Sequence, residues 1–391
     1  MPPPCAGAQR NELEPCPVPI SPMDEYLAHQ TTDTFDIVFT SDRNFYDRYY
    51  FNCHPSSGEL FLVAGLGQYP NLGITDAFVS ISHGTKQYTV RASRELGNDR
   101  LDTSVGPLSV EVVKGLRSLR VRCAPNDWGV AFDLLFEGTI PALEEPKSFS
   151  RSRARITQDV SRYAQVGTWS GELEVGGQHY ELDPKTWKGA RDHSWGVRPV
   201  GEPEAPGIKW KDMANRTVGL MHNWLPMQFD DYMIKVSLDE DCDGNRLQEE
   251  SVKVWNFGID KPNEPMGRPE VANTWISGTR EIAKSVVTLH PPGGRPLRSI
   301  NTPLRTVYLA AGSGYRPDAE WGHGTWRGEH VVQGLVHDLS TPALRAPWSF
   351  LNETLCRFEL ETGEVGYGMH ETLCVGIHRP SGFMTPDAMA P

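Results

Sequence analysis

Short segments of alternating hydrophobic and polar residues make up most of this chain. Alternation with a period of two is typical of β-strands that bury one face, and glycine and proline separate the segments at short intervals. The predicted strands lie at 34–42, 58–64, 76–82, 86–92, 109–123, 129–137, 169–175, 178–182, 216–224, 231–238, 251–258, 273–281, 285–290, 305–311, 323–335 and 355–378. The pattern predicts an antiparallel all-β protein with few short helices.

The length of the chain predicts two domains. Its 391 residues exceed the size at which one hydrophobic core stops growing. Strands this short and numerous most simply close into barrels or sandwiches that hide their sheet edges. We place a flexible N-terminal segment at 1–23, a first β domain at 24–165 and a second at 166–391. The second domain opens with a predicted hairpin at Gly176-Gly177, because two glycines suit the positive φ values of a tight turn.

Charge and composition limit the possible binding partners of the protein and the cellular compartment in which we expect it. The formal net charge is −12 and no long basic run is present, so we expect no nucleic-acid partner. No stretch reaches the roughly 18 consecutive apolar residues of a membrane span, and residues 1–22 contain no apolar run typical of a signal peptide. The seven cysteines form no C-x-x-C pair, which favours free thiols in a reducing compartment. We therefore expect a cytoplasmic protein, and the sequence also allows a homodimer.

The segment 189–198 (GARDHSWGVR) concentrates chemically active side chains between two glycines. In an extended strand, successive side chains alternate between faces. Arg191, His193 and Trp195 would then share one face, and Asp192, Ser194 and Arg198 the other. Asp192 and His193 cannot both enter one pocket from a regular strand, so either a bulge re-aims one of them or only one belongs to a site.

A second polar cluster lies at 221–224 (MHNW), directly after an apolar stretch. Alternation would place the imidazole of His222 and the indole of Trp224 on one face, inside the second barrel. The competing interpretation is that His222 is a core histidine with its hydrogen bonds satisfied.

Metal and cofactor sites are not expected. His330 follows Glu329 directly, as Glu371 follows His370, and a regular strand turns such neighbours apart. The chain has no H-E-x-x-H motif, no glycine fingerprint that leads into a helix and no G-x-S-x-G elbow. We therefore expect neither a metal nor a cofactor.

Segment 189–196 has the pattern G-x-R-D-H-S-W-G. Together with 41–46 (SDRNFY) and 69–73 (YPNLG), this pattern resembles bacterial proteins with two tandem lipocalin-like β-barrels, which are related to carotenoid 1,2-hydratase (hydroxyneurosporene synthase) and to lipocalin-like Diels–Alderases. The resemblance implies a ligand cavity inside a barrel or between the two barrels. It also implies cofactor-independent chemistry on large apolar molecules.

These observations lead to a hypothesis about function. We expect a hydratase, isomerase or cyclase that acts on a hydrophobic terpenoid-, polyketide- or steroid-like molecule by general acid catalysis. Asp192 is the first candidate for the acid and His193 the second. The candidate substrate-binding residues are Arg191, Trp195, Arg198, His222 and Trp224.

Three alternatives remain open at this point. Asp192 and His193 could instead bond to neighbouring backbone and lock the junction between the domains. The protein could be a non-catalytic binder or carrier of a hydrophobic small molecule. The tryptophans alone would also suit a carbohydrate-processing sandwich, which would need paired carboxylates across a groove.

Overall fold

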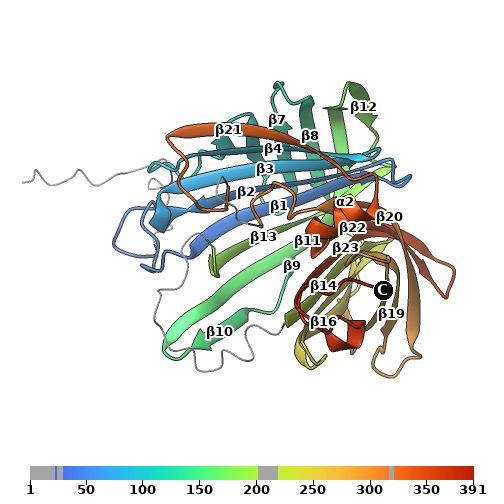
Figure 1. Ribbon diagram of the computed structural model, residues 1–391. Helices are drawn as coiled ribbons and strands as arrows, with labels where there is room; N and C mark the ends of the chain where they lie inside the picture. Colours follow the sequence, from blue (N-terminus) through green and yellow to red (C-terminus); the bar gives the residue numbers. More distant parts are fainter. Residues whose placement is uncertain (1–22, 24–29, 201–218, 317–320) are drawn as a thin grey trace, which may run out of the picture.

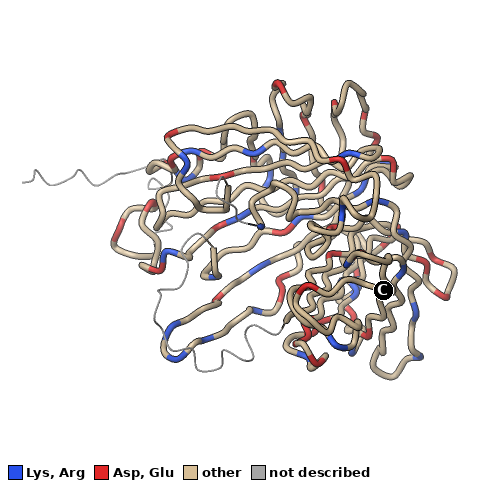
Figure 2. Tube along the Cα trace, viewed as in Figure 1, with Lys and Arg blue, Asp and Glu red and all other residues tan. Residues whose placement is uncertain are grey.

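The computed structural model describes residues 23, 30–200, 219–316 and 321–391. Apart from Met23, the N-terminal segment expected at 1–23 lies outside the described residues. Within the described part, the strands form two antiparallel sheets that curl against each other (Figure 1). No helix there is both long and apolar enough to cross a membrane. Figure 2 shows basic and acidic residues interspersed over both sheets.

The first sheet contains fourteen of the described strands. Its hydrogen-bonded order is β21-β4-β3-β2-β1-β13-β11-β8-β7-β6-β5, and β9, β10 and β12 also pair with β11. The strands are β1 (Phe45–Pro55), β2 (Leu60–Tyr69), β3 (Ile74–His83), β4 (Lys86–Glu95), β5 (Ser104–Val105), β6 (Leu108–Lys114), β7 (Ser118–Cys123), β8 (Val130–Gly138), β9 (Leu143–Glu144), β10 (Ser148–Ser152), β11 (Arg155–Val175), β12 (Gln178–Leu182), β13 (Trp187–Val197) and β21 (His330–Asp338). The sheet curls until β5 lies against β3 and β4.

The second sheet contains nine described strands in the order β17-β16-β15-β14-β23-β22-β20-β19-β18. They are β14 (Gly219–Gln228), β15 (Tyr232–Asp241), β16 (Arg246–Trp255), β17 (Glu264–Pro265), β18 (Glu270–Trp275), β19 (Ile282–Leu289), β20 (Leu297–Tyr308), β22 (Leu351–Leu360) and β23 (Val365–Gly376). The short helices are η2 (Pro70–Leu72), α2 (Pro342–Arg345), η3 (Ala346–Trp348) and η4 (Arg379–Ser381). The expected all-β class with few short helices is confirmed.

The two sheets divide the chain later than the expected boundary at 165–166. The predicted hairpin exists, with φ of +57° at Gly176 and +81° at Gly177, but its strands β11 and β12 belong to the first sheet. β13 pairs with β1 on one side and β11 on the other, so it is an interior strand of that sheet. β21 also joins the first sheet by pairing along β4, which covers what would otherwise be a free edge. Local alternation could not show these long-range pairings.

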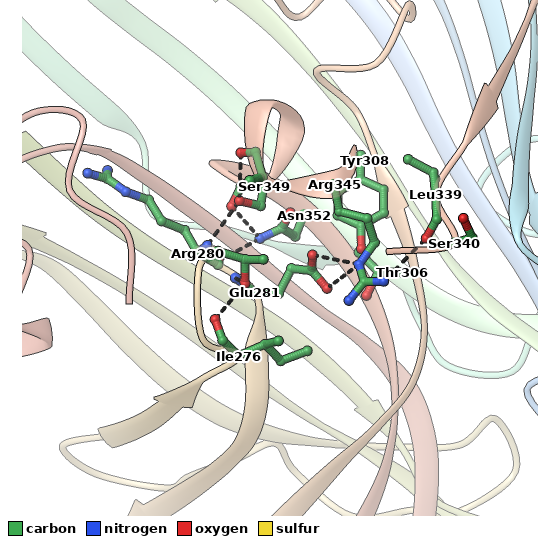
Figure 3. A network of polar contacts seen from close by, with 12 residues as sticks. Ile276, Arg280, Glu281, Thr306, Tyr308, Leu339, Ser340, Arg345, Ser349 and Asn352 are labelled. Carbon is green, nitrogen blue, oxygen red and sulfur yellow. Dashed lines mark hydrogen bonds and ion pairs between the residues drawn. The ribbon is translucent and has the colours of Figure 1, made fainter. Parts of the chain in front are cut away.

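The connection from β21 back to the second sheet is held by a polar network around α2 (Figure 3). Arg345 Nε donates to both carboxylate oxygens of Glu281, at 2.9 and 3.2 Å. The backbone N–H of Arg280 donates to Ser349 Oγ at 2.9 Å, and Asn352 Nδ2 donates to the Arg280 carbonyl at 2.9 Å. The network fixes the point where the chain returns from one sheet to the other.

The strand expected at 34–42 is absent. The described chain makes turns and bends there, and the first strand begins at Phe45. Short polar side chains bond locally: Thr34 Oγ1 donates to Asp36 Oδ1, and Asp42 Oδ1 accepts from the Asn44 N–H at 2.9 Å. Such local bonds compete with sheet pairing, which explains why the alternating pattern does not form a strand.

Three large apolar clusters organise the packing. The first fills the inside of the first sheet around Phe51, Phe136 and Trp169. The second lies where the two sheets face each other and includes Tyr50 and Trp224. The third packs the inside of the second sheet. The main cavity of the structure opens beside the second cluster, and both include Tyr315, Leu351 and Leu373.

Candidate functional site

A cavity of about 670 Å³ lies between the two sheets. Both sheets line it, and its apolar lining is Pro146, Val160, Pro199, Val200, Leu220, Leu351 and Leu373. Its volume falls in the range of small-molecule pockets, roughly 300 to 1,000 Å³. The structure therefore supplies a chamber between the sheets, one of the two positions that the resemblance implied.

The cavity leads into a narrow recess of about 60 Å³ that is crowded with ionisable side chains. The recess and the cavity share six lining residues: Arg48, Arg162, Arg198, His222, Tyr315 and Glu371. The recess adds Tyr50, Asp192, Ser194, Trp224 and Glu353. Ionisable side chains therefore enter the recess from both sheets, and segment 189–198 supplies only Asp192 and Arg198 of them.

The register of the first sheet explains how Asp192 reaches the recess. β13 pairs with β1 without interruption from Arg191 to Val197, which places Tyr50 opposite Asp192 and Arg48 opposite Ser194. Residues opposite each other in an antiparallel pair share a face. Because no bulge interrupts this stretch, Asp192 and Ser194 point into the recess and His193 points to the other face.

Asp192 is an acid in a dry setting. Burial raises the pKa of its carboxyl to about 6, against the opposing effect of the Arg162 guanidinium, and the Glu145 and Glu371 carboxylates add to the rise. Among the described residues no side chain or backbone group forms a hydrogen bond with this carboxyl. The group is therefore free to bond to a ligand in the recess.

His193 bonds to side chains on the inner face of the first sheet. Its Nε2 bonds to Asp47 Oδ1 at 2.6 Å, and its Nδ1 bonds to the Tyr163 hydroxyl at 3.1 Å. Trp195 lies edge-on to both rings and is 38% exposed. The structure thus brings these residues together, but away from the recess.

Arg191 lies on the same inner face and is buried. Its Nε donates to Gln165 Oε1 at 3.0 Å, and its guanidinium lies over the Phe136 and Tyr163 rings. Arg191 and Trp195 therefore do not line the cavity, whereas Arg198 lines both the cavity and the recess.

His222 and Trp224 share a face of β14, as alternation predicted, but that face points toward the first sheet and not into a second barrel. His222 Nδ1 is hydrogen-bonded to Asp239 Oδ1. Burial alone would lower the pKa of His222, but the Asp239 carboxylate outweighs burial and raises it. The Trp224 indole N–H donates to Glu145 Oε1 at 2.8 Å, which orients the ring at the recess wall.

Arg48 is a recess residue that the sequence analysis missed. It is 3% exposed and lies between the rings of Phe78 and Tyr315, 5.7 and 4.7 Å from their centroids. Its Nη2 lies 3.0 Å from His323 Nε2, and His323 Nδ1 lies 3.3 Å from Asp76 Oδ1. Burial lowers the pKa of His323 to about 4, so the neutral ring accepts from Arg48 and donates to Asp76.

Glu353 and Glu371 were also missed as residues of this site. They come from β22 and β23, and sequence reasoning weighed Glu371 only as a metal ligand beside His370. A polar residue at an inward position of two successive apolar strands is the signal that could have found them. Which strand faces which could not be known without the sheet order.

One group of metal-type ligands occurs in the described part of the chain, at Asp241, Cys242 and Asp243. It lies at a surface turn outside the cavity, and the Asp243 carboxylate is paired with Arg379.

The fold and the cavity define a two-sheet antiparallel β-protein with a charged recess between its sheets. The chain belongs to a family of unknown function (DUF8625), which it matches over residues 20–384. No curated protein matches it.

Solved structures similar to this chain include kievitone hydratase from Nectria haematococca, at 12% identity over 83% of this chain and 88% of that one, with a TM-score of 0.44. CghA with Sch210972 is similar at 9% identity over 88% of this chain and 90% of that one, with a TM-score of 0.47. CghA alone gives 9% identity, 85% and 88% coverage, and a TM-score of 0.45.

Proposed function

We propose that this protein is an enzyme that converts a small molecule by proton transfer in the cavity between its sheets. The reaction is of the hydratase, isomerase or cyclase type, and Asp192 is its general acid. The observation that carries the proposal is the Asp192 carboxyl, which faces the recess with a pKa of about 6 and without a hydrogen-bond partner among the described residues. Proton transfer by a carboxyl needs no cofactor.

A carboxyl with this pKa suits acid catalysis near neutral pH. With a midpoint near 6, roughly a tenth of the Asp192 carboxyls carry a proton at pH 7. Efficient general acids titrate near the working pH, because they then combine a usable protonated fraction with a strong tendency to donate. An exposed aspartic acid would be almost fully ionised at that pH.

The lining and volumes of the cavity and the recess support the proposal of an amphiphilic substrate. The outer cavity offers leucine, valine and proline side chains to an apolar body of terpenoid, polyketide or steroid size. The recess of about 60 Å³ admits only a small group, since one water needs roughly 10 to 15 Å³ of such space. We therefore propose a largely apolar substrate with one oxygen-bearing or unsaturated end that enters the recess.

Comparison of wild type with Asp192→Asn tests the proposal. Cells that express each protein are extracted, and their small molecules are compared by mass spectrometry. We expect a product that accumulates with wild type and whose precursor accumulates with the variant. Asp127→Asn, which changes an exposed aspartate outside the cavity, is the control and should behave as wild type.

The rival function is non-catalytic binding of the same kind of ligand. Native mass spectrometry of freshly purified protein separates the two. A binder would retain one unchanged molecule in wild type and in Asp192→Asn alike. An enzyme would yield different retained molecules, product in wild type and substrate in the variant. Unchanged turnover by a folded Asp192→Asn protein would remove Asp192 from the acid role.

A further inference from the structure

We propose that Glu353 and Glu371 form a second acid–base pair of the cavity, holding one proton between them and facing Asp192 across the recess. This inference rests on the proposed function and deepens it. It concerns residues of the second sheet, whereas the acid proposed above belongs to the first.

The register of the second sheet places the two carboxyls side by side. Glu353 of β22 is directly opposite Glu371 of β23, and Glu371 is in turn opposite Trp224 of β14. Directly opposite residues have Cβ atoms about 4.5 to 5.5 Å apart and share a face. All three side chains line the recess. The backbone pairing therefore forces two carboxyls together at the recess wall.

The surroundings prevent both carboxyls from being ionised at once. Glu353 is 1% exposed, and both of its carboxylate oxygens are buried without a hydrogen-bond partner in the part of the chain that is described. No lysine or arginine nitrogen among the described residues lies within salt-bridge distance of either glutamate. Burial, and next the charge of Glu371, raise the pKa of Glu353 well above its usual range, against the opposing effect of the nearby Tyr50 hydroxyl. Like charges at this separation retain a proton, as coupled carboxyl pairs do.

Groups from every neighbouring element face the pair. They are Arg48 and Tyr50 of β1, Arg162 of β11, Asp192 of β13, Arg198 directly after it, His222 of β14, and Tyr315. Asp192 is the acidic member of this set, and its charge adds to the effect on Glu353. The three guanidiniums stabilise the ionised members of the recess without pairing directly with the two glutamates.

Asp192 on one wall and the Glu353–Glu371 pair on the other suit a reaction that adds a proton to one atom of the substrate and removes a proton from another. In an isomerisation, protonated Asp192 would give its proton to one carbon of an unsaturated substrate while the ionised member of the pair takes a proton from another carbon. One C–H bond forms, one breaks and the double bond moves, so atoms and charge balance. The proton then returns to Asp192 through water in the outer cavity. The substrate class is therefore an unsaturated or enolisable molecule whose reacting end is uncharged.

Carbon-13 NMR of protein labelled at the glutamate side-chain carboxyls tests the shared proton without any substrate. Glu353→Gln and Glu371→Gln assign the two signals. We expect Glu353 to remain protonated at pH 7 in wild type, and its midpoint to fall by about one unit or more, tenfold in the protonation constant, in Glu371→Gln. Glu359→Gln, on the same strand but exposed and paired with Arg357, is the matched control and should leave the Glu353 signal unchanged.

Ionised Glu353 at pH 7 in wild type, or an unchanged midpoint in Glu371→Gln, would overturn the proposal. If Glu371→Gln does not fold, infrared spectroscopy decides: the carbonyl band of a protonated carboxyl must be present in wild type at pH 7 and absent in Glu353→Gln. The two proposals fail separately. If Glu353 titrates as expected and Asp192→Asn is fully active, the shared proton stands and Asp192 loses its role as the acid. If Glu353 titrates like an ordinary glutamate and Asp192→Asn is inactive, Asp192 keeps that role and the shared proton is disproved.

Discussion

The inside of the first sheet and the space between the two sheets are built in opposite ways. The inside of the first sheet is filled by large apolar side chains such as Phe51, Phe136 and Trp169, and a hollow of about 10 Å³ lies along it, lined in part by Leu66 and Val121. The space between the sheets keeps a cavity of about 670 Å³ that ends among arginines and carboxyls. The curled first sheet is packed with apolar side chains, whereas the space between the sheets holds the ionisable groups on which the proposed reaction depends.

Strand β13 shows how one segment serves both regions. Its odd-numbered side chains, Arg191 and His193, bond on the inner face, and its even-numbered Asp192 and Ser194 line the recess. The strand is held on both sides by β1 and β11, so the orientation of Asp192 does not depend on a loop. Simple alternation therefore divides a motif of adjacent polar residues between bonds within the first sheet and the lining of the recess.

The largest expected effect is a loss of stability from a change in the apolar core inside the first sheet. Trp169→Ala removes a fully buried indole that packs against Phe136, with ring centroids 5.2 Å apart, and donates to the Asn52 carbonyl at 2.9 Å. We expect a loss of about 3 to 5 kcal/mol in the free energy of unfolding. Urea denaturation measures it. If Trp169→Ala instead changed the pKa of Asp192 and left the free energy of unfolding as in wild type, the contrast between the two regions would be wrong.

The next effect concerns the recess and depends on pH. Because the folded-state pKa of Asp192 is raised to about 6 from 3.8, ionisation of this group costs stability as pH rises through that window. Asp192→Asn removes the cost. The stability of the variant relative to wild type should rise by about 2.4 kcal/mol between pH 4 and pH 8, at about 1.4 kcal/mol per pKa unit. Chemical denaturation at several pH values measures this difference, and Asp127→Asn is the control.

A smaller effect distinguishes the structural role of His193 from the proposed acid role of Asp192. His193→Ala removes the hydrogen bonds to Asp47 and Tyr163, while Asp47 keeps its ion pair with Arg100 at 2.9 Å. We expect a loss of about 1 to 2 kcal/mol in stability and turnover within about twofold of wild type. A variant that is fully stable but inactive would instead place His193 in the reaction.

The smallest effect is at the cavity wall. Asp239→Asn removes the carboxylate that raises the pKa of His222, so that pKa should fall. NMR titration of the imidazole protons measures the midpoint. The exposed His290, which pairs with Glu270 elsewhere, serves as an internal control in the same spectra. A His222 midpoint that does not move would show that Asp239 does not control this side of the cavity.

The sequence supports the architecture better than it supports the site. Local alternation and the Gly176-Gly177 turn suffice for the all-β class and for one hairpin, because both depend on neighbouring residues. Alternation also predicts that Asp192 and His193 point to opposite faces. It cannot say which face meets the other sheet, since that depends on pairing between strands far apart in the chain.

The missed residues have the same explanation. Arg48, Glu353 and Glu371 meet Asp192 only because β1, β22 and β23 come together across the two sheets. Arg191 and Trp195 were expected to bind the substrate, yet the alternation of side chains along β13 turns them away from the recess. Adjacency in the chain is a poor guide to a site built from facing sheets.

The central claim is that the gap between the sheets holds Asp192 as a protonatable acid. The most direct measurement is the pH titration of its side-chain carboxyl by carbon-13 NMR in aspartate-labelled protein, with the signal assigned by its loss in Asp192→Asn. We predict a midpoint near 6. A midpoint near 3.8, the value of an ordinary aspartate, would contradict it.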